Sequence, residues 1–282
     1  MITQSFARKA SGVPILSRAQ IDQIGEEVIR NYNPYLLERP QEVDIDDLIQ
    51  NHLRLHQEYH YLSHNGSILG MMVFYDSNGI IVFNPDLNEA EYVSIFANTI
   101  VVDNSLLDEY QEARYRFTVA HEASHNLLHR EYFEELYKQK TTENTSEFTQ
   151  CRIDTMTEMT GARYWVDNDW MEWQANCLAS AILMPKSMVT RAISELDNKD
   201  IPKEERAKYE RRMISQIFNV SWEAAEYRLS KLELLSPTIK AEDLPKTVPP
   251  AKRKRVAYSL TDEDHLFIRK HEARLLRAAG IE

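Results

Sequence analysis

The segment RFTVAHEASHNLLHR, residues 116–130, contains three histidines and a glutamate whose spacing could support chemistry. His121 and His125 are four residues apart, so an α-helix would place both imidazoles on one face, about one turn apart. Two imidazoles in this arrangement can share a metal ion. Glu122 between them could take a proton from metal-activated water and pass it to a leaving amine. The segment therefore predicts a metal-dependent hydrolytic helix.

The same pattern also arises by chance in ordinary amphipathic helices, so a third ligand is needed to support a site. His129 lies a further four residues along the segment. It cannot join His121 on one ion, because on a straight helix the two residues are about 12 Å apart along the axis. We therefore expect His129 to pack or to support a ligand. Leu128 and Glu131 exclude the metzincin pattern, which has Gly and His at these positions.

An acidic residue on a second helix is the remaining source of a third ligand. The segment 167–185 predicts a helix that ends at Pro185. Glu172 is expected in its first turn, with Asn176 one turn later on the same face. Glu172 is also explained as the third residue of a capping box that starts at Asp169. Spacing favours Glu172 but leaves open three rival acids: Glu158, Asp167 and Asp169.

Two blocks of the sequence resemble the ImmA/IrrE family of metallo-endopeptidases. RFTVAHEASHNLLH, residues 116–129, is similar to the family signature RFTLAHELGHLLLH. EWQANCLASAILMP, residues 172–185, is similar to the second block of the family, in which a glutamate precedes an Ala-Asn pair. Ala123-Ser124 replaces the usual Leu-Gly, which spares the chemistry. The resemblance extends over roughly residues 15–235, and two motifs in the correct order are more specific than one.

This resemblance implies both a fold and a function. The expected fold is α+β and mostly helical, with a zincin-like core in which a small sheet packs on the HExxH helix, followed by a small helix-turn-helix-like helical region. The expected function is a zinc-dependent endopeptidase that cleaves a helix-turn-helix transcriptional repressor of a mobile element, prophage or stress regulon. The implied roles are zinc ligands His121, His125 and Glu172, catalytic acid/base Glu122, and supporting residues Asn176 and His129.

Two parts of the expected mechanism rest on less specific features. An edge strand near residues 100–103 is expected to hold an extended substrate by β-augmentation. The group that stabilises the oxyanion stays open among Tyr132, Tyr164 and the more distant histidines.

Composition narrows the class of protein. The 282 residues carry a formal net charge of -11, which argues against a general nucleic-acid-binding surface. The two cysteines belong to no CxxC or Cys/His cluster, so neither a disulfide framework nor a zinc knuckle is predicted. Residues 1–20 contain no apolar signal segment, and no stretch approaches the ~20 apolar residues of a membrane span. We therefore expect a cytoplasmic protein with no membrane contact.

Composition shifts divide the chain into four predicted regions. Ser17 and either Asp44 or Asp46 are the expected helix N-caps near its beginning. Basic residues 252–255 indicate a solvated linker. The regions are N-terminal helices (1–60), a zincin-like metallopeptidase core (61–190), a helix-turn-helix-like helical region (191–236), and a linker, basic arm and terminal helix (237–282).

Short apolar runs predict a small sheet ahead of the HExxH helix. Asn65-Gly66 and Asn78-Gly79 are typical hairpin turns, and residues 100–103 are expected to form a further strand. Residues 138–150 are polar and predict a loop.

The alternative function is a DNA-binding or protein-binding transcriptional regulator with a vestigial metal site. Residues 214–232 have helix-turn-helix spacing, with Arg228 and Lys231 on the second helix. Glu223 and Glu226 would bring acids close to phosphates, so we favour a helical unit that packs or binds protein.

Overall fold

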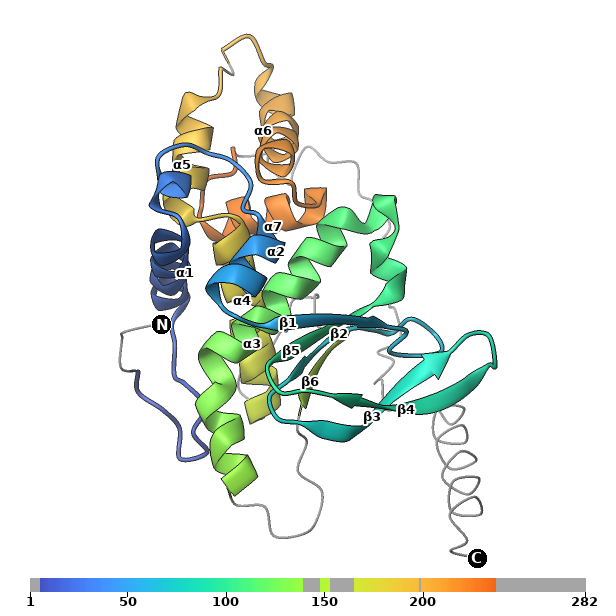
Figure 1. The fold of residues 1–282 in the computed structure, drawn as a ribbon. Coiled ribbons are helices and arrows are strands. Elements are labelled where there is room, and N and C mark those ends of the chain that lie inside the picture. Colours follow the sequence, from blue (N-terminus) through green and yellow to red (C-terminus); the bar gives the residue numbers. More distant parts are fainter. Residues whose placement is uncertain (1–5, 139–147, 153–164, 198, 237–282) are drawn as a thin grey trace, which may run out of the picture.

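The computed structural model in Figure 1 has a mixed α+β fold dominated by helices. It describes residues 6–138, 148–152, 165–197 and 199–236. The α+β, mostly helical class that the sequence predicts is confirmed. The predicted linker, basic arm and terminal helix of residues 237–282 lie outside the described residues.

The first long helix, α1 (Arg18–Tyr32), begins where the sequence predicts. The Ser17 hydroxyl accepts a hydrogen bond from the backbone N–H of Gln20 at 3.3 Å, which caps the first turn. Gly25 lets α1 approach a later helix closely, because a Cβ atom at this position would lie 2.7 Å from the Cβ of Ala181. This contact fixes α1 against the helix that carries Glu172.

The second helical segment is shorter than the sequence predicts. Asp44 caps α2 (Ile45–Asp47) through the backbone N–H of Asp47, and the chain continues as the π-helical segment η2 (Leu48–His52). The sequence predicts N-terminal helices as far as residue 60, but Arg54 takes a left-handed φ of 58° and ends the helical path. The next residues form strand β1 (His56–His60). Three short 3-10 segments complete the helical turns: η1 (Pro34–Leu37), η3 (Asn104–Leu107) and η4 (Glu109–Gln111).

Four strands form the sheet beneath the candidate site. Their order is β1-β5-β2-β6; β1 and β5 are parallel, whereas β2 is antiparallel to both β5 and β6. All residues of β2 and β5 are buried, since these strands lie in the middle of the sheet. The bounds are β2 (Ile68–Val73), β5 (Thr99–Asp103) and β6 (Phe148–Arg152).

Two strand predictions are wrong. The strand at residues 100–103 is not an edge strand, because β1 and β2 flank it and occupy its backbone hydrogen-bonding groups. Asn78-Gly79 is not a hairpin turn but lies within β3 (Ser77–Asn84), at a shift in its register with β4 (Glu89–Ile95). The chain reverses at residues 85–88 instead, where the Asn84 side chain accepts hydrogen bonds from two backbone N–H groups.

Two other connections differ in part from the predictions. Asn65-Gly66 does form a turn, with Gly66 at a φ of 65°, but it joins β1 to β2, which are not neighbours in the sheet. The turn therefore does not close a hairpin. Of the predicted loop at residues 138–150, residues 148–150 belong to β6, which pairs with β2. Residues 139–147 lie outside the described part of the chain.

The long helix α3 (Glu112–Lys138) packs between the sheet and α4 (Asp167–Leu183), and α1 covers α4 in turn (Figure 1). The other face of the sheet packs against the β3–β4 hairpin through a second apolar cluster that includes Met71, Ile80 and Val101. The candidate residues on α3 and α4 therefore lie at the centre of the layers.

Three helices complete the described chain: α5 (Lys186–Glu195), α6 (Lys203–Phe218) and α7 (Trp222–Lys231). The Ser221 hydroxyl caps α7 after a short turn from α6. Phe218 is fully buried and joins the same apolar cluster as the residues of α1 and α4. Within the described residues, we find no helix with the length and apolar character to cross a membrane.

Candidate metal centre

The middle of α3 places the HExxH residues in the protein interior. Every residue from Thr118 to His125 is buried, because the sheet lies on one side of α3 and α4 lies on the other. Ala120 and Ala123 are small, so both neighbours can approach the helix closely. An ordinary amphipathic helix would expose one face here, whereas this segment is enclosed on all sides.

His121, His125 and Glu172 converge across the α3–α4 interface. The Nε2 atoms of the two histidines are 3.1 Å apart. The carboxylate oxygens of Glu172 lie 3.3 Å from Nε2 of His121 and 3.4 Å from Nε2 of His125. Both histidines are fully buried and Glu172 is 5% exposed. Among the described residues, they form a group of potential metal ligands whose donor atoms lie within 4.8 Å of one another.

This donor set fits a zinc ion. Zinc binds imidazole nitrogen and carboxylate oxygen at similar distances, and two such donors in a tetrahedral site lie about 3.3 Å apart. The separations of 3.1, 3.3 and 3.4 Å in this cluster are close to that value. Two histidines and one glutamate also match the ligand set of catalytic zinc sites that keep a fourth position for water or substrate.

The remaining ring nitrogens of the two histidines are held by other side chains. His121 Nδ1 lies 3.0 Å from the Asn176 amide oxygen, one helical turn beyond Glu172 on α4. His125 Nδ1 lies 3.0 Å from Nδ1 of His129, so His129 contacts the cluster from behind. Partners of this kind orient ligand histidines and fix which nitrogen carries the proton.

Sequence reasoning missed Gln174, which contacts His129. The Gln174 amide oxygen lies 3.0 Å from His129 Nε2, and its amide nitrogen donates to the carbonyl oxygen of Pro14 at 2.6 Å. A polar residue in the apolar stretch of α4 was the available signal for Gln174. No sequence pattern pointed to Pro14, because 160 residues separate it from Gln174.

Glu122 follows His121 on α3 and is fully buried against strand β2. Gly70 of that strand lies beside Glu122 and is a second residue that the sequence analysis missed. A Cβ atom at position 70 would lie 2.6 Å from the Thr118 methyl group and 3.0 Å from the Glu122 Oε1 atom. Only glycine therefore leaves room for both side chains at this point of the sheet.

Electrostatics favour the ligand forms of these side chains. Burial alone raises the pKa of Glu172, but His125 and His121 together lower it by more, so the pKa stays well below its usual range. Glu172 is therefore ionised at neutral pH. Burial lowers the pKa of His125 and outweighs the opposing effect of Glu172. A neutral imidazole and an ionised carboxylate are the forms that bind a metal.

The rival acids of α4 have other partners. The structure begins α4 at Asp167, so Glu172 lies in the second turn and not, as the sequence predicts, in the first. Asp169 is instead the third residue of the helix and accepts from the backbone N–H of Val166 at 3.0 Å. Asp167 accepts from Lys9 at 2.9 Å. Both acids therefore stabilise the beginning of α4 and its contact with the N-terminal segment.

Of the two tyrosines considered for oxyanion stabilisation, Tyr132 lies in the described part of the chain and is not brought to the cluster. Tyr132 lies two turns beyond His125 on α3, where its ring packs edge-to-face with Phe133 and where a Cβ atom at Gly12 would lie 3.7 Å from it. Tyr164 and the remaining rival acid, Glu158, lie outside the described residues.

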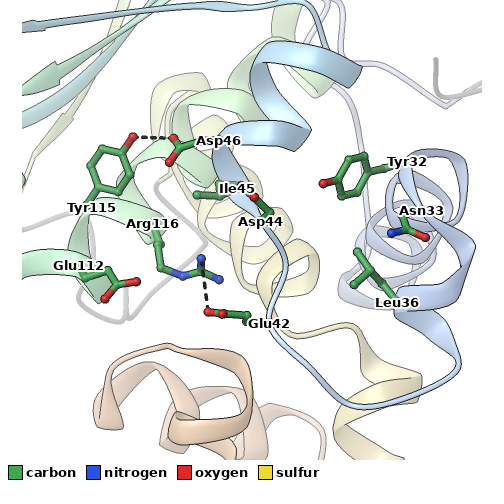
Figure 2. Close-up of a pocket in the computed structure, with 10 residues that line it drawn as sticks. All are labelled: Tyr32, Asn33, Leu36, Glu42, Asp44, Ile45, Asp46, Glu112, Tyr115 and Arg116. Carbon is green, nitrogen blue, oxygen red and sulfur yellow. Dashed lines mark hydrogen bonds and ion pairs between the residues drawn. The ribbon is translucent and has the colours of Figure 1, made fainter.

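A separate acidic pocket of about 500 Å³ lies between η1, α2 and α3 (Figure 2). Its carboxylates contact neighbouring side chains: Tyr115 donates to Asp46 at 2.6 Å, and Glu42 lies 3.8 Å from Arg116. Burial and the hydrogen bond to Asp46 raise the pKa of Tyr115. The pocket shares no residue with the metal cluster. Its contacts join α2 to α3 and are sufficient to explain its charges.

A family model, the IrrE N-terminal-like domain (Peptidase_M78), matches residues 152–230. This segment contains Glu172 and Asn176 but begins after the HExxH helix. No curated protein matches the chain.

One solved structure, a Mycobacterium tuberculosis transcriptional regulator, aligns with 75% of this chain at 11% identity and a TM-score of 0.39. The chain spans 46% of the length of that protein. The family match is more informative, because it falls on the second of the two blocks that suggested the resemblance. It supports the predicted resemblance of residues 152–230 to the ImmA/IrrE family.

Proposed function

We propose that this chain is a zinc-dependent endopeptidase in which His121, His125 and Glu172 hold the metal. The observation that carries the proposal is the convergence of these three buried side chains, with separations that suit one zinc ion. The family match to a metallopeptidase supports the same class of reaction independently of the geometry. A zincin-like arrangement, with the sheet behind the HExxH helix, accounts for the order of the layers.

Glu122 is the proposed acid/base of the reaction. A zinc ion in the cluster would act as a Lewis acid on water and on the peptide carbonyl. Glu122 accepts the proton of the attacking water and later donates it to the leaving amine. Glu122 follows His121 directly on α3, and Gly70 leaves the space beside its buried carboxylate.

The proposed substrate is a protein, and the family resemblance narrows it to a helix-turn-helix transcriptional repressor. Because β5 is internal to the sheet, it does not hold this substrate. In the described part of the sheet, the outer strands are β1 and β6, and strand addition would have to use one of these edges.

The regulator alternative loses one of its expected DNA contacts. Arg228 is 2% exposed and donates to Asp22 at 2.6 Å, so it is not available to phosphates. The Lys231 ammonium lies over the ring of Tyr227, 5.1 Å from the centre of the ring. A buried arginine of this kind favours a packing role for α7.

A cleavage assay tests the proposal. We would incubate the zinc-loaded protein with the repressor encoded beside its gene and compare Glu122→Gln with Glu131→Gln. Both variants change one glutamate of α3, but Glu131 is exposed and pairs with Arg8. We expect Glu122→Gln to lower the cleavage rate by ~10²–10⁴-fold with its zinc content unchanged, and Glu131→Gln to cleave normally.

Two results would contradict this assignment. Full cleavage by Glu122→Gln would remove Glu122 from the mechanism. A protein that takes up no zinc and cleaves nothing, but binds a specific DNA sequence tightly, would support the regulator instead.

A further inference from the structure

A chain of buried polar groups runs from the candidate metal centre to the N-terminal segment. We call it the Pro14 chain; its members are His125, His129, Gln174 and Pro14. Successive contacts measure 3.0 Å from His125 to His129, 3.0 Å from His129 to Gln174 and 2.6 Å from Gln174 to Pro14. The three side chains are fully buried, so no water competes for these contacts.

The carbonyl group of Pro14 sets the direction of every hydrogen bond in this chain. A carbonyl oxygen only accepts, so the Gln174 amide nitrogen must face it and the Gln174 oxygen must face His129. That oxygen requires an N–H group at Nε2 of His129. A neutral imidazole carries one N–H, so Nδ1 of His129 accepts, and Nδ1 of His125 must donate to it.

We propose that Gln174 and His129 are positioning residues that hold His125 with its proton on Nδ1, so that the Nε2 lone pair faces the metal cluster. This inference rests on the proposed metal site but concerns a property of the protein without metal. Neither residue is proposed to touch the metal or the substrate.

The competing tautomer of His125 shows why such support matters. The Glu172 carboxylate lies 3.4 Å from Nε2 of His125 and would accept a proton placed on that nitrogen. In that state the proton would occupy the direction in which the metal binds. The acceptor at Nδ1 of His129 favours the opposite tautomer. His121 has a simpler support, the Asn176 oxygen 3.0 Å from its Nδ1.

The first test is a direct measurement of the tautomer. We would label the full chain with ¹⁵N-histidine, remove metal with a chelator and record long-range ¹H–¹⁵N spectra, with His125→Asn to assign the signals. We expect a protonated Nδ1 and an unprotonated Nε2 for His125. A proton on Nε2 of His125 would overturn the inference. Because this measurement needs neither zinc nor peptidase activity, its outcome is separate from that of the proposed function.

The second test uses three variants and the affinity for Co²⁺ and Zn²⁺. Gln174→Leu removes the acceptor for His129 and should populate both His125 tautomers and weaken metal binding by ~10–100-fold. Gln174→Glu retains an acceptor for His129 and, as the protonated acid that burial against the Pro14 carbonyl favours, a donor to Pro14, so it should keep the wild-type tautomer and an affinity close to that of the wild type. The control Ser124→Ala removes a different buried hydrogen bond of α3, from Ser124 to the Ala120 carbonyl.

The pattern across the variants decides between positioning and mere packing. Recovery in Gln174→Glu, with Ser124→Ala close to wild type, supports positioning. Equal metal affinity and an unchanged His125 tautomer in Gln174→Leu would overturn it. Equal losses in Gln174→Leu and Ser124→Ala would also overturn it, because the loss would then follow stability; thermal unfolding of each variant is measured alongside.

Discussion

Two buried charged clusters contact α4 and differ in one respect. The first lies near the beginning of α4, where the ligand atoms of His121, His125 and Glu172 face one another. Beyond its end, Arg228 donates to the Asp22 carboxylate at 2.6 Å and to the Met184 carbonyl at 3.0 Å. The second group, which we call the Arg228 cluster, contains its own cation. The first contains none among its ligand atoms.

This difference separates a structural cluster from a binding site. A buried charge costs free energy unless an opposite charge or hydrogen bonds compensate for it. In the Arg228 cluster the guanidinium compensates for Asp22 and ties α7 to α1. In the metal cluster, the carboxylate and the two imidazole nitrogens are compensated fully only when a cation binds between them. Burial alone therefore does not identify a site; the missing charge does.

The largest expected effect comes from removing the charge of the metal cluster. Glu172→Gln keeps the size of the side chain but replaces the carboxylate with a weak amide ligand. We expect zinc affinity to fall by more than the ~10–100-fold typical of a lost supporting partner. Competition with a chromogenic chelator measures it. Asp167→Asn, which changes a rival acid on the same helix, should bind zinc normally; stoichiometric zinc in Glu172→Gln would exclude Glu172 as a ligand.

Breaking the Arg228 cluster should affect stability instead. Arg228→Met leaves the Asp22 carboxylate buried without its cation, and we expect the free energy of unfolding to fall by ~3–5 kcal/mol. Urea unfolding measures this change, and the zinc content of the folded fraction should remain at wild-type level. The double variant Asp22→Leu/Arg228→Met removes both charges and should recover most of the loss. If Arg228→Met instead lost zinc at unchanged stability, the two clusters would be coupled and the comparison would fail.

The sequence predicted most of the metal cluster because its information is local. Two histidines four residues apart need only a helix to come together, and α3 supplies it. The helix that carries Glu172 ends at Leu183, two residues before Pro185, as its apolar pattern and the proline predict. The long-range step, which brings Glu172 to the histidines, came from the family resemblance and not from spacing.

The rest of the fold depends on pairings that a sequence does not display. The position of β5 between β1 and β2 depends on a parallel pairing of β1 with β5. This pairing joins His56 to Thr99, which are 43 residues apart, and no turn motif in the sequence predicts it. The role of Gly70 depends on how closely a strand approaches α3, and that distance is a tertiary property. Gln174 could be noticed as polar, but its partner Pro14 could not be inferred.

A smaller effect on kcat is expected from a substitution at Gly70, where strand β2 packs against Glu122. Gly70→Ala would place a methyl group 2.6 Å from the Thr118 methyl and 3.0 Å from the Glu122 carboxylate, so Glu122 must shift. A misplacement of about 1 Å can cost up to ~10²-fold in rate, and we expect kcat to fall by ~10–100-fold while zinc affinity stays nearly constant. Steady-state kinetics and zinc titration measure the two quantities.

The double variant Gly70→Ala/Thr118→Ser tests the physical cause. Serine at position 118 removes the methyl group that the new Cβ would meet, so part of the lost kcat should return. A Gly70→Ala variant with wild-type kcat would show that Glu122 tolerates the contact. A variant that loses zinc instead would show that β2 supports the ligands and not the acid/base.

The smallest effect is a difference in pH dependence between the two clusters. Burial, and then the nearby His125, lower the pKa of His129 well below its usual value. As the pH falls below about 6.5, His129 takes up a proton in the unfolded chain but not in the folded one. Its contribution to stability is therefore complete above that pH and is lost as the pH falls toward the lowered pKa. The loss is at most ~1.4 kcal/mol per pH unit for one histidine.

Urea unfolding of the chelator-treated protein between pH 5 and pH 8 measures this slope, and the range spans the usual histidine pKa of about 6.5. We expect His129→Phe to have a shallower slope than the wild type, because it removes one buried group that titrates there. Arg228→Met should lower stability by nearly the same amount at every pH in the range, since the arginine stays charged throughout. An unchanged slope in His129→Phe would mean that His129 is already protonated in the folded chain. The contrast between a neutral imidazole beside the metal cluster and a charged arginine in the Arg228 cluster would then be wrong.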